Sequence, residues 1–129
     1  MGKDLVREHK HVIVRAYVNN PPKDKEQLSE WCNNVISDVG MKLIGGPLVV
    51  YSDMKGNEGY TAVAILDFSH LAIHTWDNIS PALIEFDLFS CKDFDINFVM
   101  KRLDEFEINS YSNLVVDRDD FDHQQIVWK

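Results

Sequence analysis

A short stretch in the middle of the chain combines a hydroxyl, two imidazoles and an indole, and a thiol follows it. The stretch reads Ser69-His70-Leu71-Ala72-Ile73-His74-Thr75-Trp76, and Phe89-Ser90-Cys91 comes later in the chain. Hydroxyl, imidazole and thiol groups carry out nucleophilic and acid–base catalysis. A serine hydrolase is not indicated, because no G-x-S-x-G elbow surrounds any serine. A Cys–His protease would need an orienting Asn or Asp, which the sequence alone does not place.

The order of these residues resembles the core motif of the prokaryotic S-adenosylmethionine decarboxylases, small enzymes that make a pyruvoyl cofactor from their own backbone. The family pattern is S-H-x-x-I-H-T-W, followed by an apolar strand that ends in an aromatic residue, a small hydroxyl residue and a cysteine. Each part is present here in order between Ser69 and Cys91. The resemblance extends over residues 11 to 117 and is sharpest between Thr61 and Cys91.

The resemblance implies that the chain cuts itself between Phe68 and Ser69. The Ser69 hydroxyl would attack the carbonyl carbon of Phe68 and convert the amide into an ester. A base would remove the Ser69 α-proton, and β-elimination would leave a dehydroalanine that hydrolyses to the pyruvoyl group. Such a ketone forms a Schiff base with a substrate amine and accepts electrons when carbon dioxide leaves.

The family's functional residues carry over to single positions of this chain. His74 takes the position of the processing base, and Cys91 that of the proton donor in decarboxylation. Thr61 stands where the family has a second serine hydroxyl that assists processing. Like His70, Trp76 belongs to the motif in a supporting role, and we expect it at the substrate.

Two positions depart from the family pattern. Phe68 stands where a glutamate or a small polar residue is usual, and Asp77-Asn78 stands where Pro-Glu is usual. The family glutamate holds the ribose hydroxyls, and Asn78 can hydrogen-bond a hydroxyl but cannot accept from two donors as a carboxylate does. Tyr51 is a candidate for stacking on the base, and Tyr60 is an equal alternative.

These departures leave three functions open. The leading prediction is pyruvoyl-dependent decarboxylation of S-adenosylmethionine to the aminopropyl donor of spermidine synthesis. The same chemistry can act on another amino acid, such as arginine or ornithine. A homologue that binds a partner without processing itself is the third possibility, although Ser69, His74, Thr61 and Cys91 are all retained.

Composition limits the class of protein. The 129 residues fit one domain, 1–129, and no apolar run is long enough for a membrane span. The net charge of −8 leaves no basic stripe for nucleic acid and would suit a cationic substrate, although it can equally serve solubility alone. The two cysteines and the lack of a secretory signal predict reduced thiols in the cytoplasm.

The pattern of apolar residues predicts an α+β two-layer domain, with a mainly antiparallel sheet and two helices on one face. Strands are expected at 11–18, 48–51, 61–66, 82–89 and 110–116, and helices at 25–39 and 96–106. Gly45-Gly46-Pro47 is expected to interrupt the chain before the second strand, and residues 117–129 to form a loose tail. The resemblance implies a homodimer, in which a second protomer covers the other sheet face and the active sites lie at the interface.

Other candidate groups have structural explanations. Cys32 lies on the apolar stripe of the first helix, where a buried thiol is expected to be inert. Four residues of strand separate His70 and His74 by roughly 13 Å, which is too far for shared metal coordination. The sequence therefore predicts no metal site.

Overall fold

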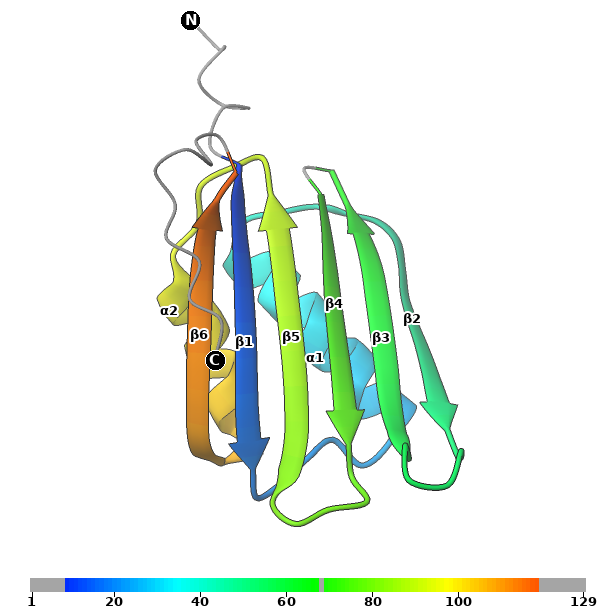
Figure 1. The fold of residues 1–129 in the computed structure, drawn as a ribbon. Coiled ribbons are helices and arrows are strands. Elements are labelled where there is room, and N and C mark those ends of the chain that lie inside the picture. Colours follow the sequence, from blue (N-terminus) through cyan, green and yellow to red (C-terminus); the bar gives the residue numbers. More distant parts are fainter. Residues whose placement is uncertain (1–8, 68, 119–129) are drawn as a thin grey trace, which may run out of the picture.

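The computed structural model describes residues 9–67 and 69–118. Its elements, in chain order, are β1 (Lys10–Val18), α1 (Lys25–Asp38), β2 (Leu43–Ser52), β3 (Gly59–Leu66), β4 (Ser69–Trp76), β5 (Ala82–Ser90), α2 (Ile96–Leu103) and β6 (Ile108–Asp117). The strands form one antiparallel sheet in the order β2-β3-β4-β5-β1-β6. Both helices lie on the same side of it (Figure 1). This is the predicted two-layer arrangement.

Helix α1 begins where its sequence predicts. The Asp24 carboxylate accepts a hydrogen bond of 2.7 Å from the backbone N–H of Gln27, and the Gln27 side chain accepts one from Lys23 N–H. The first bond satisfies a donor in the open first turn of the helix, and the second holds the residue before the N-cap. The helix ends at Asp38, Val39 is its C-cap, and Gly40 follows with φ +75°. The apolar side chains between these ends are buried: Leu28, Trp31, Cys32, Val35 and Ile36.

The core fills the space between the helices and the sheet. In β5, the predicted alternation holds, because every second side chain points to the helices and is buried: Ala82, Ile84, Phe86 and Leu88. Trp31 of α1 packs edge to face on Phe86 and tilted on Phe106, with ring centroids 5.7 and 5.3 Å away. Its indole N–H donates to the carbonyl oxygen of Arg102. The indole thus ties α1 to α2 across the core.

Two predicted elements, the second strand and the second helix, differ most from the structure. Strand β2 is continuous, because Gly45-Gly46-Pro47 forms a bulge within it instead of interrupting it. Gly46 has φ +90°, and a Cβ there would lie 2.8 Å from the carbonyl oxygen of Val63, so the bulge requires glycine. Helix α2 is shorter than predicted, since a 3-10 turn, Asp104–Phe106, replaces its last residues. Phe106 is nevertheless buried as predicted.

The sheet face away from the helices is not covered by any element within residues 9–67 and 69–118 (Figure 1). We call it the open face. Its large exposed apolar residues are Ile13, Leu48, Val50, Val63, Ile65 and Leu114. Leu48 and Ile65 are 62% and 60% exposed. These residues form two groups, one on β2 and β3 and one on β1 and β6, and exposed apolar groups on an uncovered sheet face are typical of interaction sites.

The sequence also predicted a loose C-terminal tail and no membrane span. Most of the predicted loose tail, residues 119–129, lies outside the described residues, and Asp117 is the last residue of β6. Neither helix in the described ranges is long and apolar enough to span a membrane.

An ion pair between the two helices should make stability depend on pH. The hydrogen bond from the Arg102 guanidinium lowers the pKa of Asp38, with 2.5 Å between Nε and Oδ2. A carboxyl whose pKa is lower in the folded state stabilises the fold above its unfolded pKa of about 3.9, and this stabilisation disappears as the pH falls through the folded value. Asp38→Asn should therefore lower the free energy of unfolding by about 1 kcal/mol at pH 7.

Urea unfolding of the wild type and of Asp38→Asn between pH 2.5 and 8 tests this prediction. The difference between the two proteins should stay constant from pH 8 down to about pH 5 and shrink toward zero below about pH 4. Arg102→Met is a second variant that removes this pair together with the Arg102–Glu105 pair, and its difference from the wild type should also shrink at low pH. A difference that is still undiminished at the lowest pH would contradict the explanation.

Candidate active site

Ser69 and Cys91 lie next to each other at one end of the sheet. Ser69 opens β4 and pairs with Ser90, the last residue of β5, so that Cys91 follows directly beside it. The strand spacing of about 4.8 Å and the rise of about 3.3 Å per residue place the Cα atoms of Ser69 and Cys91 roughly 6 Å apart. Phe68, the other partner of the predicted cleavage, lies outside the described residues.

The Ser69 hydroxyl is unusual in its surroundings. Ser69 has the same phase along β4 as the buried Leu71 and Ile73, so its side chain points to the helix side of the sheet. Among the described residues, its Oγ is the one buried side-chain polar atom without a hydrogen-bond partner. Buried hydroxyls are almost always paired, and an unpaired one indicates strain or a chemical role.

Thr61 and His74 form a second pair of polar groups. They lie directly opposite each other on β3 and β4, and Thr61 Oγ1 is 3.0 Å from His74 Nδ1. A hydrogen bond to Nδ1 fixes the imidazole ring and leaves Nε2 directed elsewhere. Both side chains are half-buried on the open face. This is the arrangement of an imidazole base held by a hydroxyl.

The two pairs do not meet within one protomer. Five residues of strand separate Ser69 from His74, which corresponds to about 16 Å, and an odd separation puts the two side chains on opposite faces of the sheet. The predicted processing base is therefore distant from the predicted cleavage point in a single chain. The structure brings together Ser69 with Cys91, and Thr61 with His74, but not the four residues.

The comparison with protein families decides what this chain is. The family model described as S-adenosylmethionine decarboxylase matches residues 10–119. The chain belongs to the S-adenosylmethionine decarboxylase family. This confirms the resemblance and, with it, the prediction of a carboxy-lyase of this type.

One solved structure supports the fold of this family member. The chain is similar to the crystal structure of the adenosylmethionine decarboxylase from Aquifex aeolicus VF5, with a TM-score of 0.70 and 18% sequence identity over 94% of this chain and 98% of that one. The likeness confirms the predicted α+β fold. A search of curated protein sequences gave no significant match.

The decarboxylase motif extends beyond His74 to Trp76, which lies on the open face. The Trp76 ring is tilted against the His74 ring with 6.0 Å between centroids, and its indole N–H donates to Asn57 Oδ1 at 2.7 Å. The hydrogen bond to Asn57 connects the end of β4 to the β2–β3 turn. Trp76 and His74 are therefore neighbours on the open face.

Tyr51 and Asn78 lie around the end of β4 and not beside His74. Tyr51 pairs with Tyr60 and shares the helix-side phase of the sheet, with ring centroids 4.8 Å apart. Its hydroxyl donates to Asp77 Oδ1 at 3.2 Å. Burial, followed by this bond, raises the pKa of Tyr51, so that the phenol is neutral at physiological pH. Asn78 is exposed in the β4–β5 turn.

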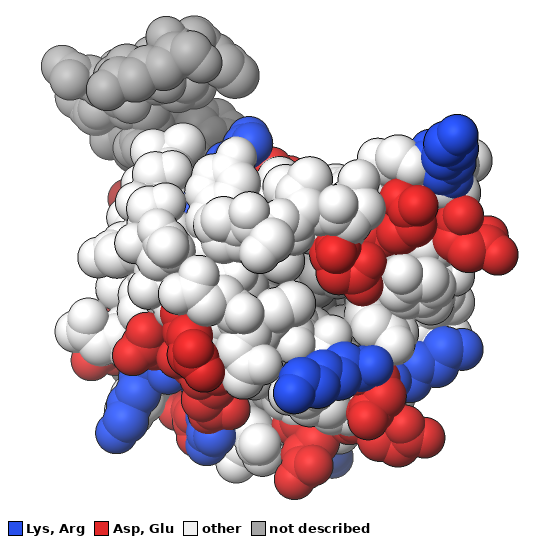
Figure 2. Space-filling model, turned by 90° about the horizontal axis from the view of Figure 1, so that it is seen from below, with Lys and Arg blue, Asp and Glu red and all other residues white. Residues whose placement is uncertain are grey.

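The end of the molecule that holds these turns is acidic in places. Figure 2 views the protein from this end and shows Asp and Glu side chains in groups around an uncharged centre, without a continuous basic patch. Asp77 and Glu58 both contribute to the raised pKa of Tyr51. Carboxylates and neutral aromatic rings together favour a cation over an anion in this region.

The open face of this decarboxylase-family chain also carries a cluster that sequence reasoning missed. Asp87 of β5 lies between two imidazoles, with its Oδ1 3.2 Å from His11 Nε2 and 3.9 Å from His70 Nε2. Both imidazole rings pack against Phe89. Alternation along β1 and β5 predicts that these side chains point away from the core. It does not predict that they meet, which depends on β5 lying between β1 and β4. Among residues 9–67 and 69–118, no group of side chains with metal-binding geometry occurs.

The two cysteines differ in their surroundings. Cys32 is fully buried in the core, and burial raises the pKa of its thiol to about 12. Cys91 is partly exposed at the end of β5. A thiol reagent should therefore find Cys91 and not Cys32 in the folded protein.

Proposed function

We propose that this protein is a pyruvoyl-dependent S-adenosylmethionine decarboxylase whose cofactor forms from Ser69. The single observation that carries the proposal is the buried Ser69 hydroxyl, which has no hydrogen-bond partner; the pairing of Ser69 with Ser90 also places its backbone next to that of Cys91. Conversion to the pyruvoyl group would replace the unpaired hydroxyl with a methyl group, which needs no hydrogen-bond partner. The site therefore fits the group. The product would be the aminopropyl donor for spermidine in the cytoplasm.

The chain's own residues would perform the processing. Ser69 Oγ attacks the Phe68 carbonyl carbon, the peptide C–N bond breaks, and an ester joins the two residues. His74, held by Thr61, takes the Ser69 α-proton, and the Cβ–O bond breaks to release the Phe68 carboxylate. Water then replaces the nitrogen of the new terminus, and ammonia leaves. The pyruvoyl carbonyl supplies an electrophile for the substrate amine and an acceptor for the electron pair that carbon dioxide leaves behind.

The chain's residues would also complete decarboxylation. Cys91 lies about 6 Å from Ser69 by strand geometry and would return a proton to the substrate. Trp76, beside His74 on the open face, would pack on the substrate. Tyr51 and Asn78 are proposed substrate contacts at the acidic end, where Tyr51 is neutral and bonded to Asp77. A sulfonium substrate is a cation and suits this end of the site.

We further propose that the active site forms between two copies of the chain. His74 faces the open side of the sheet, and no described element covers the Ser69 end of β4 on that side. The open faces of two chains can stack on each other around a two-fold axis. This axis would lie between the two sheets, run perpendicular to the strands and pass near Ala72. This axis would place Thr61 and His74 of one protomer over the Ser69 end of its partner. Stacking would also cover the exposed apolar residues of the open face.

Intact mass of freshly purified, denatured protein tests the processing. Two fragments are expected, residues 1–68 with a free carboxylate and residues 69–129 with a blocked end. Their summed mass should equal that of the chain plus one water minus one ammonia. A single full-length mass that long incubation does not change would exclude the pyruvoyl group in the isolated chain. The partner-binding homologue would then be the better explanation.

Release of labelled carbon dioxide tests the substrate. S-adenosylmethionine labelled in its carboxylate should release label, whereas arginine and ornithine should not. Because Asn78 stands at the position of the family glutamate, the amino acids are the necessary comparison. Turnover of arginine without turnover of S-adenosylmethionine would refute the proposed substrate but not pyruvoyl-dependent decarboxylation.

A further inference from the structure

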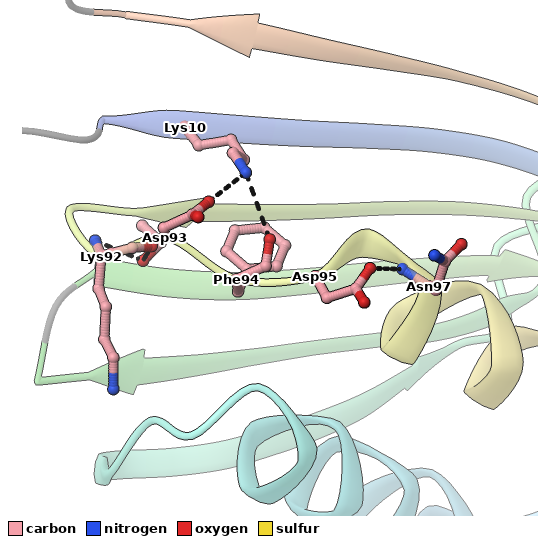
Figure 3. A network of polar contacts seen from close by, with 7 residues as sticks. Lys10, Lys92, Asp93, Phe94, Asp95 and Asn97 are labelled. Atoms are coloured by element: carbon pink, nitrogen blue, oxygen red, sulfur yellow. Dashed lines mark hydrogen bonds and ion pairs between the residues drawn. The ribbon is translucent and has the colours of Figure 1, made fainter.

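The loop after Cys91 is held down by a lysine from a distant strand. Lys10 of β1 lies opposite Ser90, and Ser90 lies opposite Ser69, so the three residues form one row across the end of the sheet. The Lys10 ammonium donates to the Asp93 carboxylate and, at 3.3 Å, to the carbonyl oxygen of Phe94 (Figure 3). It also lies 5.3 Å from the centroid of the Phe94 ring. We call Lys10, Asp93 and Phe94 the clasp.

Further contacts fix the loop on either side of the clasp. Ser90 Oγ accepts from the backbone N–H of Lys92 at 2.8 Å and donates to its carbonyl oxygen, so Cys91 lies inside a closed turn. The Lys92 ammonium donates to the carbonyl oxygen of Gly40. Asp95 then caps α2 by accepting from Asn97 N–H (Figure 3). The loop therefore has anchors at both ends, and the clasp is the one between them that reaches β1.

The Lys10–Asp93 contact of the clasp is an ion pair. The Lys10 side chain is 29% exposed, and the hydrogen bond from Lys10 lowers the pKa of Asp93. Asp93 is therefore an anion at neutral pH, and the bond is charge-assisted. Its carboxylate is 62% exposed and fills no part of the core, so its loss should loosen the loop without unfolding the protein.

We propose that the clasp positions the thiol of Cys91 beside Ser69, and that Lys10 and Asp93 are positioning residues for proton return to the substrate. This inference rests on the function proposed above, in which Cys91 is the proton donor. A proton donor must lie within hydrogen-bond reach of its acceptor, so a displacement of about 1 Å costs much of its contribution. The clasp supplies that restraint from the strand next to β5.

Thiol kinetics with a disulfide reagent test the clasp directly. The reagent should titrate one thiol, Cys91, since Cys32 is buried with a raised pKa. The rate should be measured as a function of pH up to its plateau, where the thiol is fully ionised and only access to the sulfur limits the reaction. The plateau rate of Asp93→Ala should exceed that of the wild type about three- to tenfold, a modest factor because the pair is partly exposed.

Two further variants control for charge and position. Glu105→Gln removes a partner of Arg102 away from the loop and should leave the plateau rate unchanged. Lys10→Glu should raise the rate like Asp93→Ala, and combining it with Asp93→Lys should restore part of the restraint by reversing the pair. An unchanged plateau rate in Asp93→Ala, or no recovery in the reversed pair, would overturn the clasp.

Steady-state kinetics separate positioning from a purely structural role. Asp93→Ala should be cleaved into its two fragments as completely as the wild type, and should lower kcat severalfold with KM for S-adenosylmethionine unchanged. A fall in kcat/KM through KM alone would count against positioning of the proton donor. If neither protein is cleaved, the proposed function fails, while the thiol kinetics still decide whether the clasp holds the Cys91 loop.

Discussion

Replacing Ser69 with alanine should leave the chain in one piece and abolish decarboxylation. The substitution removes the nucleophile of the acyl shift and the oxygen that leaves in the elimination, so no ketone can form. We expect no cleavage by intact mass after prolonged incubation and a fall in kcat/KM of roughly 10⁴-fold or more, to the background of the assay. No other single serine-to-alanine substitution in this chain should have an effect of this size.

The fold of this variant should be intact. Ser69 Oγ is buried without a hydrogen-bond partner, and removal of such a group is neutral or stabilising. Its free energy of unfolding should therefore equal or exceed that of the unprocessed wild-type chain, by up to about 1 kcal/mol. Ser37→Ala, at an exposed position of α1, is the matched control and should be cleaved normally. A cleaved Ser69→Ala chain would refute the assignment of the cofactor precursor.

Much of the fold followed from local sequence signals. Asp24, Gln27 and Gly40 delimit α1, and alternation in β5 identifies its buried face, because caps and periodicity act over a few residues. The bulge at Gly46 was not predicted, since a glycine-proline stretch predicts a loop unless a neighbouring strand continues the pairing. Here β3 pairs on both sides of the bulge.

The candidate site was predictable only in part, for a related reason. The motif gives the spacing of Ser69, His74 and Cys91 along the chain. It does not give the faces on which they lie, and the odd spacing of Ser69 and His74 puts them on opposite sides of β4. His11 and Asp87 carry no motif, and their meeting with His70 depends on β5 lying between β1 and β4. Strand order is a long-range property that short patterns do not contain.

Mixing two inactive variants should restore cleavage if the site forms between two protomers. His74→Ala and Ser69→Ala should each remain uncleaved when expressed alone. In a mixed dimer, one site would combine the intact Ser69 of the His74→Ala chain with the intact His74 of the Ser69→Ala chain. The expected result is cleavage of the His74→Ala chain only, in about half of its copies after random pairing of equal amounts.

The two chains can be distinguished by tags of different mass, co-expressed and followed by intact mass. A mixture of His74→Ala with Thr61→Ala is the matched control, because both changes fall in the same pair and each mixed dimer would have no complete Thr61–His74 pair. That control should be cleaved more slowly than the Ser69→Ala mixture. Cleavage that never recovers in the Ser69→Ala mixture would exclude a shared site.

Failure of recovery would have a specific structural meaning. A single chain would then have to bring His74 to Ser69 over about 16 Å of a strand that is hydrogen-bonded on both sides. This would require β4 to leave the sheet, with loss of its buried residues Leu71 and Ile73 from the core. Burial of two such side chains stabilises a fold by roughly 3–6 kcal/mol, a large part of what a domain of this size has. Pairing of two open faces requires no such loss, and for that reason the shared site is the arrangement that this sheet favours.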